Sequence, residues 1–549
     1  MQLSPSRGRR PAGTADGVGS PDDARTGTAT GMQALPGTGA GGPRRHVEVL
    51  IVGSGFAGLG AAIRLDRAGH PDFLVIERGS GVGGTWRDNT YPGAACDIPS
   101  HLYSFSFAPN SDWSRSYSRQ PEILDYLRRT AARSGTLDRH RFDTELLSAR
   151  WEADGRRWIV ETSTGTFTAT VLVTAFGALC EPKLPAIDGI ERFAGEIFHS
   201  ARWNPDSELT GKRVAVIGTG ASAIQLIPEI APLVSHLDVY QRTAPWVMPR
   251  PDHRFSPAQR VALRHVPGYQ RLRRGLIYGR LEVTSLAFAC APRILDLISG
   301  QAAAHLRSQI ADPALRQQLT PRFQMGCKRI LFSDDYYPAL SRDNVELVTS
   351  PIAGLTENAI VTADGAARHI DTLIVATGFH VTDSPTADLI TGADGHTLRQ
   401  CWRQSGQRAY KGSTVAGFPN LFMLVGPNTG TGNMSMIYMI ESQLNYLLDA
   451  LRLMERLQLA TVEVRQPDQD RYTATLRRRM RRTVYSSGCS SWYRDELGEN
   501  TALWPGFAFA FRSITRRFDL DAYRVTTSAE PADAIAPIGG SAGTTQLIG

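Results

Sequence analysis

Two segments of this sequence contain regularly spaced glycines and residues that could do chemistry. In the first, Gly53, Gly55 and Gly58 form a GxGxxG pattern between an apolar, β-branched run and a helix-like stretch. Such glycines make a tight turn, let backbone approach a pyrophosphate and allow a helix to pack closely on a strand. Glu77 ends the next apolar run, where a carboxylate can bind the ribose hydroxyls of an adenosine. The segment therefore predicts a dinucleotide-binding strand, turn and helix.

The second segment repeats this pattern with a different ending. Gly218, Gly220 and Ala223 give GxGxxA, again between an apolar run and a helix-like stretch. The next apolar run, at 237–240, ends in Gln-Arg-Thr rather than in an acid. Because a cation at this place suits the 2′-phosphate of NADPH, Arg242 predicts an NADPH site.

Parallel sheets must position both segments, because buried apolar runs of this kind are typical of parallel strands. We therefore expect an α/β fold with two Rossmann-like dinucleotide-binding domains and a helical insertion. Two such domains in one chain indicate a flavoprotein reduced by NADPH, with FAD in the first domain. The stretch "DTLIVATGF", at 371–379, resembles the motif that closes the FAD domain of two-dinucleotide flavoproteins. The expected boundaries are 45–180 and 372–525 for the FAD-binding domain, 181–249 and 326–371 for the NADPH-binding domain, and 250–325 for the insertion.

The composition of the chain fits a large multidomain protein, since its 549 residues are 42% hydrophobic and 21% charged. The net charge of +7 is modest and requires no nucleic acid, and the basic run at 477–482 lacks interleaved aromatic residues, as a solvated helix face does. The longest uncharged run, 418–440, is broken by GPNTGTGN, so we expect no membrane span. Low-complexity termini, 1–44 and 526–549, are expected to be disordered.

The six cysteines are scattered, and no CxxC pair occurs. We therefore expect no zinc or other metal site, no dithiol redox centre and no disulfide framework, as in a protein of the reducing cytoplasm. Without a dithiol, a reduced flavin must pass its electrons to another acceptor, and dioxygen is the obvious one.

Three longer motifs carry a family resemblance. "GGTWRDNTYPGAACD", at 83–97, resembles the [AG]GxWxxxx[FY]P[GM]xxxD signature of type I Baeyer–Villiger monooxygenases. "FAGEIFHSARWNP", at 193–205, resembles their FxGxxxHxxxW fingerprint, with Asn204 where the family usually has Pro or Asp. "GCKRILFSDDYYPALSRDNVEL", from Gly326, resembles the segment with the active-site arginine. The resemblance covers about 45–525 and is closest to the 4-hydroxyacetophenone and steroid monooxygenase branches.

The resemblance implies an FAD- and NADPH-dependent enzyme that inserts one oxygen atom of O2 beside a ketone carbonyl, through a C4a-peroxyflavin, to give an ester or lactone. Arg329 is then the fixed cation that stabilises the anionic peroxide, and Asp97 is the acid that orients it. His199 is the third residue expected to take part in catalysis. We expect it to act as a hinge that couples cofactor binding to the arrangement of the domains, and not as a general base.

The resemblance also implies further cofactor contacts. Lys328, Arg242 and Thr243 are expected at the NADPH 2′-phosphate, and Trp492 at the nicotinamide ribose. Residues of the FAD site, besides the first glycine turn and Glu77, are expected to be Thr85, Trp86, Asp97 and Met436.

Two alternatives remain. An N- or S-oxygenating flavin monooxygenase carries Tyr or Phe where Trp203 stands here, and the Asp97 and Arg329 pair also argues against it. A non-oxygenating NADPH-dependent flavin oxidoreductase is the second alternative. The expected partners are a small-molecule ketone and O2, with no nucleic acid and no membrane, and neither the ketone nor the oligomeric state is predicted.

Overall fold

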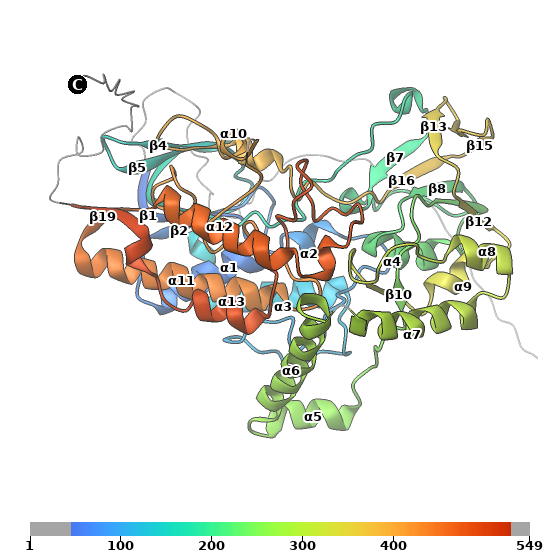
Figure 1. The fold of residues 1–549 in the computed structure, drawn as a ribbon, viewed down its shortest axis with the longest axis horizontal. Coiled ribbons are helices and arrows are strands. Elements are labelled where there is room, and N and C mark those ends of the chain that lie inside the picture. The colour runs from blue at the N-terminus through green and yellow to red at the C-terminus, as the bar shows by residue number, and fades with distance from the viewer. Residues whose placement is uncertain (1–44, 292, 404, 529–549) are drawn as a thin grey trace, which may run out of the picture. The chain divides into compact units, whose positions relative to one another are not determined.

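The computed structural model describes residues 45–528, apart from 292 and 404 (Figure 1). The disorder expected for 1–44 and for 529–549 lies outside the described residues. Thr526 and Thr527, expected in the disordered tail, are instead part of strand β20 (Tyr523–Thr527), which pairs antiparallel with β19 (Leu459–Val464).

The first glycine turn follows the central strand of an eight-stranded sheet. Strand β1 (Arg45–Val52) pairs in parallel with β2 (Phe73–Ile76) and β6 (Gly165–Thr174), and its last four residues are buried. The remaining strands of the sheet are β3 (His140–Arg141), β4 (Leu146–Glu152), β5 (Arg157–Thr162), β17 (Ile390–Thr391) and β18 (Leu421–Met423). Helices α1 (Phe56–Arg67) and α11 (Met436–Leu457) lie side by side along it and share one apolar core (Figure 1).

The second glycine turn belongs to a five-stranded parallel sheet. Its strands, in spatial order, are β12 (Val345–Val348), β9 (His236–Tyr240), β8 (Arg213–Ile217), β16 (Thr372–Val375) and β7 (Glu196–His199). Helix α4 (Ala221–Ile230) follows β8 and packs against this sheet. Strand β16, expected to open the second part of the FAD-binding domain, instead pairs with β8 and β7. The chain therefore leaves the second fold after this strand rather than before it.

The segment 250–325 forms helices in its described part, as expected. They are α5 (Pro257–His265), α6 (Tyr269–Ala289), α7 (Arg293–Gln309) and α8 (Pro313–Gln318). Ser256 and Gln259 form a capping box at α5, and Asp312 caps α8. The short strands β10 (Val247–Met248) and β11 (Leu331–Phe332) pair where the insertion begins and ends.

The remaining elements are six helices, six 3₁₀ turns and a small antiparallel sheet within the described residues. The helices are α2 (Thr85–Asp88), α3 (Gln120–Ser134), α9 (Tyr336–Leu340), α10 (Leu398–Arg403), α12 (Gln466–Met480) and α13 (Ala508–Ile514). Single 3₁₀ turns lie at 137–139, 190–192, 200–202, 385–388, 484–486 and 520–522. A three-stranded antiparallel sheet contains β13 (Ile352–Leu355), β14 (Ala359–Thr362) and β15 (Ala367–His369). Within the described residues, no helix is both long and apolar enough to cross a membrane.

The first glycine turn is closely packed. Gly53 has φ +106°, and a Cβ there would lie 2.6 Å from the carbonyl oxygen of Ala175. A Cβ at Gly58 would lie 1.8 Å from the carbonyl oxygen of Gly53, so α1 can approach β1 only because this residue has no side chain. The second turn is equally tight at Gly218, where a Cβ would lie 2.5 Å from the carbonyl oxygen of Ala376, whereas a Cβ at Gly220 would meet nothing within 4 Å.

The substitution Gly58→Ala should lower the free energy of unfolding by about 2–3 kcal/mol and reduce the flavin retained on purification, because the turn must move to admit a methyl group. Thermal unfolding of the purified protein measures the first effect, and flavin absorbance per chain measures the second. The matched control is Gly220→Ala, which should unfold like the wild type. An unchanged unfolding midpoint for Gly58→Ala would show that the turn has room for a side chain.

Candidate active site

The two residues expected to act together are joined by an ion pair. Arg329 donates to Asp97 Oδ2 from Nε at 3.0 Å and from Nη2 at 2.6 Å. Its Nη1 donates to the backbone oxygens of Thr431 and Gly432, at 3.2 Å and 3.0 Å. The guanidinium is therefore fixed from two sides, by the signature loop at 83–97 and by the loop that precedes α11.

The Arg329 side chain stays protonated and positively charged in this environment. Burial alone lowers the pKa of Arg329, but the charge of Asp97 and the hydrogen bonds to it raise that pKa above its ordinary value, with a further contribution from Tyr493. The side chain remains 22% exposed, so it can still meet a ligand. A permanent cation with limited solvent contact is suited to stabilising an anion in a reaction.

Gln225 on α4 holds the signature loop in place. Its Oε1 accepts from the Tyr91 hydroxyl at 2.9 Å and from the Ala95 amide at 3.2 Å, and its Nε2 donates to the Ala95 oxygen at 3.1 Å. The loop approaches α4 so closely that a Cβ at Gly93 would lie 2.4 Å from the Gln225 backbone oxygen. The helix of the second glycine turn thus positions the loop that carries Asp97. Sequence reasoning missed this contact, because Gln225 belongs to no recognisable motif.

Two tyrosines that sequence reasoning missed lie beside the arginine. Tyr493 is 1% exposed, and burial raises its pKa to about 12, so its hydroxyl stays protonated. Tyr485 is also buried and packs against the loop that accepts from Arg329, since a Cβ at Gly432 would lie 2.4 Å from its hydroxyl. Trp492, expected at the nicotinamide ribose, is 48% exposed and places its ring 4.3 Å from that of Tyr493.

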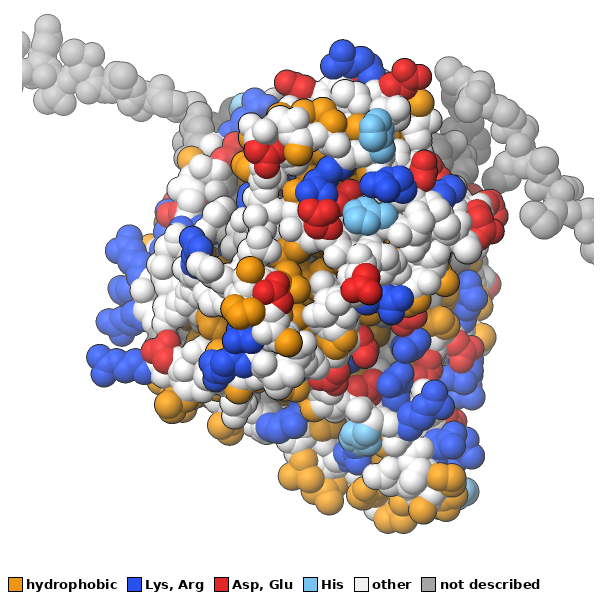
Figure 2. All heavy atoms as spheres, turned by 90° about the vertical axis from the view of Figure 1, so that its right-hand side faces the viewer, with side chains coloured by type: hydrophobic (Ala, Val, Ile, Leu, Met, Phe, Trp, Pro, Cys, Tyr) orange, Lys and Arg blue, Asp and Glu red, His pale blue; other side chains and the backbone are white. Residues whose placement is uncertain are grey.

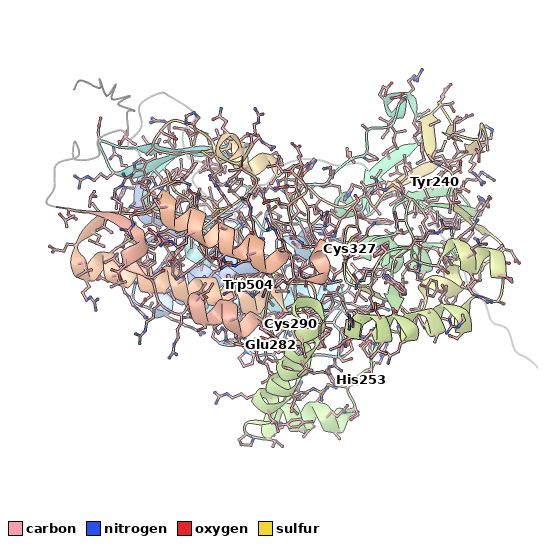
Figure 3. The ribbon with its side chains drawn as sticks, in the orientation of Figure 1. Tyr240, His253, Glu282, Cys290, Cys327 and Trp504 are labelled. Atoms are coloured by element: carbon pink, nitrogen blue, oxygen red, sulfur yellow. A yellow bond between two sulfur atoms is a disulfide. The ribbon has the colours of Figure 1, made fainter. Side chains whose placement is uncertain are left out.

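A disulfide joins Cys327 to Cys489 across 162 residues, which corrects the expectation that no disulfide would form. Cys327 lies two residues before Arg329, and Cys489 lies three residues before Trp492, so the bond ties the arginine segment to the loop at 487–500 (Figure 3). Spacing along the chain carried no signal of this bond, because cysteines so far apart are paired only by the fold.

The first dinucleotide turn has the features that FAD requires. No side chain caps the N-terminus of α1, so the amides of its first turn face the space after Gly55. The carboxylate of Glu77 accepts from the amides of Ser54 and Gly79, both at 2.8 Å, and pairs with Arg87 at 2.9 Å. A carboxylate at this place beside the turn suits a ribose.

The signature loop lies against this turn. A Cβ at Gly55 would meet the Cα of Gly84 at 3.6 Å, and Thr85 and Trp86 follow in α2. The Trp86 indole donates to the Tyr103 hydroxyl at 3.0 Å. Met436 opens α11 after the loop that holds Arg329, so this loop, α1 and α2 are the elements that would surround a flavin.

The second dinucleotide turn has two cations that lack an acidic partner. Burial lowers the pKa of Lys328, and the nearby charge of Arg242 lowers it further. No ion pair in the described part of the chain involves either residue. The N-terminus of α4 has no side-chain cap, and the backbone oxygen of Thr243 accepts from the Thr219 hydroxyl at 3.2 Å. These residues fit a 2′-phosphate, which would relieve the repulsion between the two cations.

The fingerprint histidine belongs to the second sheet. His199 ends β7 opposite Val375 of β16, its Nδ1 accepts from the Ala201 amide at 3.1 Å, and its ring contacts Phe379 at 5.6 Å. Burial lowers its pKa to about 4, so the imidazole is neutral at physiological pH. Trp203 packs on Phe198 at 5.0 Å.

These contacts favour a positioning role for His199, because its partners lie in the strand and turn that connect the two folds. A cavity of about 360 Å³ separates the fingerprint from the first fold and is lined by Arg78, Gly79, Ser80, Arg87, Asp88, Ala201, Arg202 and Trp203.

The fold and site define a two-dinucleotide flavoprotein, and comparisons with known proteins agree. A family model described as pyridine nucleotide-disulphide oxidoreductase matches residues 50–273. A Baeyer-Villiger monooxygenase of Pseudomonas aeruginosa is 48% identical over 487 residues, which cover 88% of this chain and 92% of that protein. Another, of Streptomyces coelicolor, is 50% identical over 486 residues, covering 88% and 93%. The chain therefore belongs to the Baeyer–Villiger monooxygenase family.

Solved structures give the same result. An oxidised steroid monooxygenase bound to NADP matches with a TM-score of 0.78 and 33% identity, covering 87% of this chain and 99% of that one. A complex of OTEMO with FAD and NADP matches with a TM-score of 0.80 and 27% identity, covering 88% and 100%. The expected fold, with two Rossmann-like domains, is confirmed.

Removing one of these two cations should selectively weaken the binding of NADP⁺. We expect Arg242→Ala to raise the Kd for NADP⁺ by about 10- to 100-fold, the value of a lost charge-assisted hydrogen bond. The Kd for NAD⁺ should not change, because NAD⁺ has no 2′-phosphate. Titration of the flavin-loaded protein with both nucleotides measures this. An equal loss of affinity for the two nucleotides would show that Arg242 does not contact the 2′-phosphate.

The disulfide should contribute measurably to stability. The double variant Cys327→Ser/Cys489→Ser should lower the free energy of unfolding by about 2–5 kcal/mol under non-reducing conditions, because the unfolded chain regains the freedom of a long loop. The wild-type protein in the presence of a reductant should have the same free energy of unfolding as the double variant. Cys290→Ser, at an exposed free cysteine, is the control. A wild-type unfolding midpoint that does not respond to reductant would contradict the prediction.

Proposed function

We propose that this chain is an FAD- and NADPH-dependent monooxygenase that converts a ketone to an ester or lactone. The overall reaction consumes the ketone, O2, NADPH and a proton, and yields the ester or lactone, water and NADP⁺. The observation that carries the proposal is the Asp97–Arg329 pair, which fixes a cation between the signature loop and the loop that precedes α11. Family membership supports the same reaction.

Each part of the site has a role in this proposal. Bound FAD and NADPH supply the electrons and activate the oxygen. Glu77 holds the ribose of the first cofactor, and Lys328 and Arg242 hold the 2′-phosphate of the second. Arg329 stabilises negative charge on the oxygen that attacks the carbonyl, and Asp97 keeps the guanidinium oriented. The neutral His199 positions the connection between the folds.

Labelled oxygen tests the reaction directly. Flavin-loaded protein would be incubated with NADPH, ¹⁸O₂ and a panel of ketones, with an aryl sulfide and a tertiary amine in parallel. Incorporation of one ¹⁸O atom into an ester supports the proposal. Sulfoxide or N-oxide with every ketone untouched would favour the N- or S-oxygenating alternative, and release of hydrogen peroxide alone would favour the non-oxygenating one.

Loss of the arginine should separate the two halves of the reaction. We expect Arg329→Ala to reduce ester formation by about two to three orders of magnitude, as removal of an oxyanion donor does, while NADPH still reduces the flavin. Stopped-flow absorbance follows flavin reduction, and product analysis follows the ester. Arg322→Ala, at an exposed arginine of the same segment, is the control. An unchanged ester yield would remove Arg329 from the chemistry.

The expected cytoplasmic location stays a prediction. The need for NADPH supports it, whereas the Cys327–Cys489 disulfide is typical of more oxidising compartments. Alkylation of free thiols in intact cells, followed by mass spectrometry of these two cysteines, would show which redox state the protein has there.

A further inference from the structure

The longest helix of the insertion, α6, packs on the protein through an inward face that is partly polar and partly apolar. Its inward face carries polar residues: Arg274 donates to the backbone oxygens of His101 and Ser104, at 2.8 Å and 2.9 Å. Glu282, only 8% exposed, accepts from the amides of Ala508 and Phe509 at the start of α13 (Figure 3). An amphipathic helix normally presents its apolar face to the protein and its polar face to water. The inward face of α6 also carries the apolar residues Ile277, Tyr278 and Leu281, which pack against the core of the first fold, so α6 departs from this pattern by being apolar on its outward face as well.

The outward face of α6 is apolar. The apolar face consists of Leu272, Leu276, Val283 and Leu286, which are 60%, 66%, 72% and 41% exposed. At 100° per residue these positions fall on one side of the helix. Neighbouring helices extend it, with Val261 of α5, Val266 after it, and Ile294 and Leu297 of α7 also exposed. Several exposed apolar residues on neighbouring helices are typical of a binding surface.

The charges around the apolar face are almost all positive. Between 257 and 297 the sequence has seven arginines and two acids, the buried Glu282 and the exposed Asp296 of α7. On the helical wheel of α6, the exposed Arg271 and Arg280 lie at the two edges of the apolar face. Figure 2 shows hydrophobic side chains gathered at the lower end of the molecule, where α5 and α6 lie in Figure 1, with Lys and Arg side chains beside them.

An anionic surface fits this combination better than a second copy of the chain. A two-fold contact through α6 would bring the same arginine edges of two molecules together, with no exposed acid on α5 or α6 to neutralise them. A bilayer with anionic headgroups offers acyl chains to the apolar face and negative charge to its edges.

We propose that α5 and α6 dock this enzyme on the surface of an anionic lipid bilayer. Leu272, Leu276, Val283 and Leu286 enter the boundary between headgroups and acyl chains, and Arg271 and Arg280 bind the headgroups. The proposal replaces the sequence expectation of no membrane partner with peripheral binding, not with a membrane span.

The docked helix is joined to the active site. Asn433, the residue after Gly432, donates from Nδ2 to the Leu281 backbone oxygen at 2.8 Å and to the Ser285 hydroxyl at 3.0 Å. The loop that accepts from Arg329 therefore contacts the inward face of α6 directly.

Vesicle flotation with the full-length, flavin-loaded protein tests the proposal. We expect the protein to float with vesicles of phosphatidylcholine and phosphatidylglycerol at about 3:1, to bind pure phosphatidylcholine at least about tenfold more weakly, and to lose binding as salt is raised. The double variant Leu276→Glu/Val283→Glu should reduce binding to the anionic vesicles at least about tenfold. Its flavin content and thermal unfolding should equal those of the wild type, because both side chains are exposed.

The matched control is Leu147→Glu, which places the same charge at a leucine of β4 that is 53% exposed and should bind like the wild type. Failure of the wild type to float with anionic vesicles would overturn the proposal, as would equal binding to both vesicle types. Sedimentation velocity without vesicles gives a third decisive outcome. If the double variant converts a dimer to a monomer, the apolar face joins two copies of this chain, and the proposal is wrong.

Discussion

The ion pair between Asp97 and Arg329 joins residues 232 positions apart and is the contact on which the rest of the site depends. Asp97 ends the signature loop beside the first glycine turn, and Arg329 precedes β11 at the return from the helical insertion. A half-buried arginine without its carboxylate would lose most of its favourable interactions, since only two backbone oxygens would remain. The pair therefore fixes both the charge and the direction of the guanidinium.

The contacts around this pair give it a rigid frame. Gln225 binds the signature loop from α4, the Cys327–Cys489 disulfide binds the arginine segment to the loop of Tyr493, and Asp252 pairs with Arg115 at 2.7 Å across the entrance to the insertion. Each of them connects parts of the chain that belong to different sheets or loops. These contacts therefore link the position of Arg329 to the way in which the two folds meet. We infer a similar positioning role for His199, because it ends β7, the strand that pairs with β16.

The parts of the site that the sequence predicted are local. The glycine turns, Glu77 and Arg242 follow from spacing along one strand, turn and helix, where geometry and sequence have the same order. The roles of Asp97 and Arg329 required a family motif, because no local rule pairs residues so far apart. Tyr493, Gln225 and the disulfide were missed, since each depends on contacts between distant segments. The place of β16 and the outward apolar face of α6 were missed because strand order and helix rotation are set by tertiary packing.

A double-mutant cycle on the rate of ester formation tests most directly whether Asp97 acts through Arg329. The four proteins are the wild type, Asp97→Ala, Arg329→Ala and the double variant, each loaded with flavin and compared in a single turnover with the same ketone. If the carboxylate serves only to orient the guanidinium, the double variant should be as slow as Arg329→Ala alone. If the fold reductions in rate of the two single variants multiply in the double variant, Asp97 and Arg329 act independently, which would contradict this dependence.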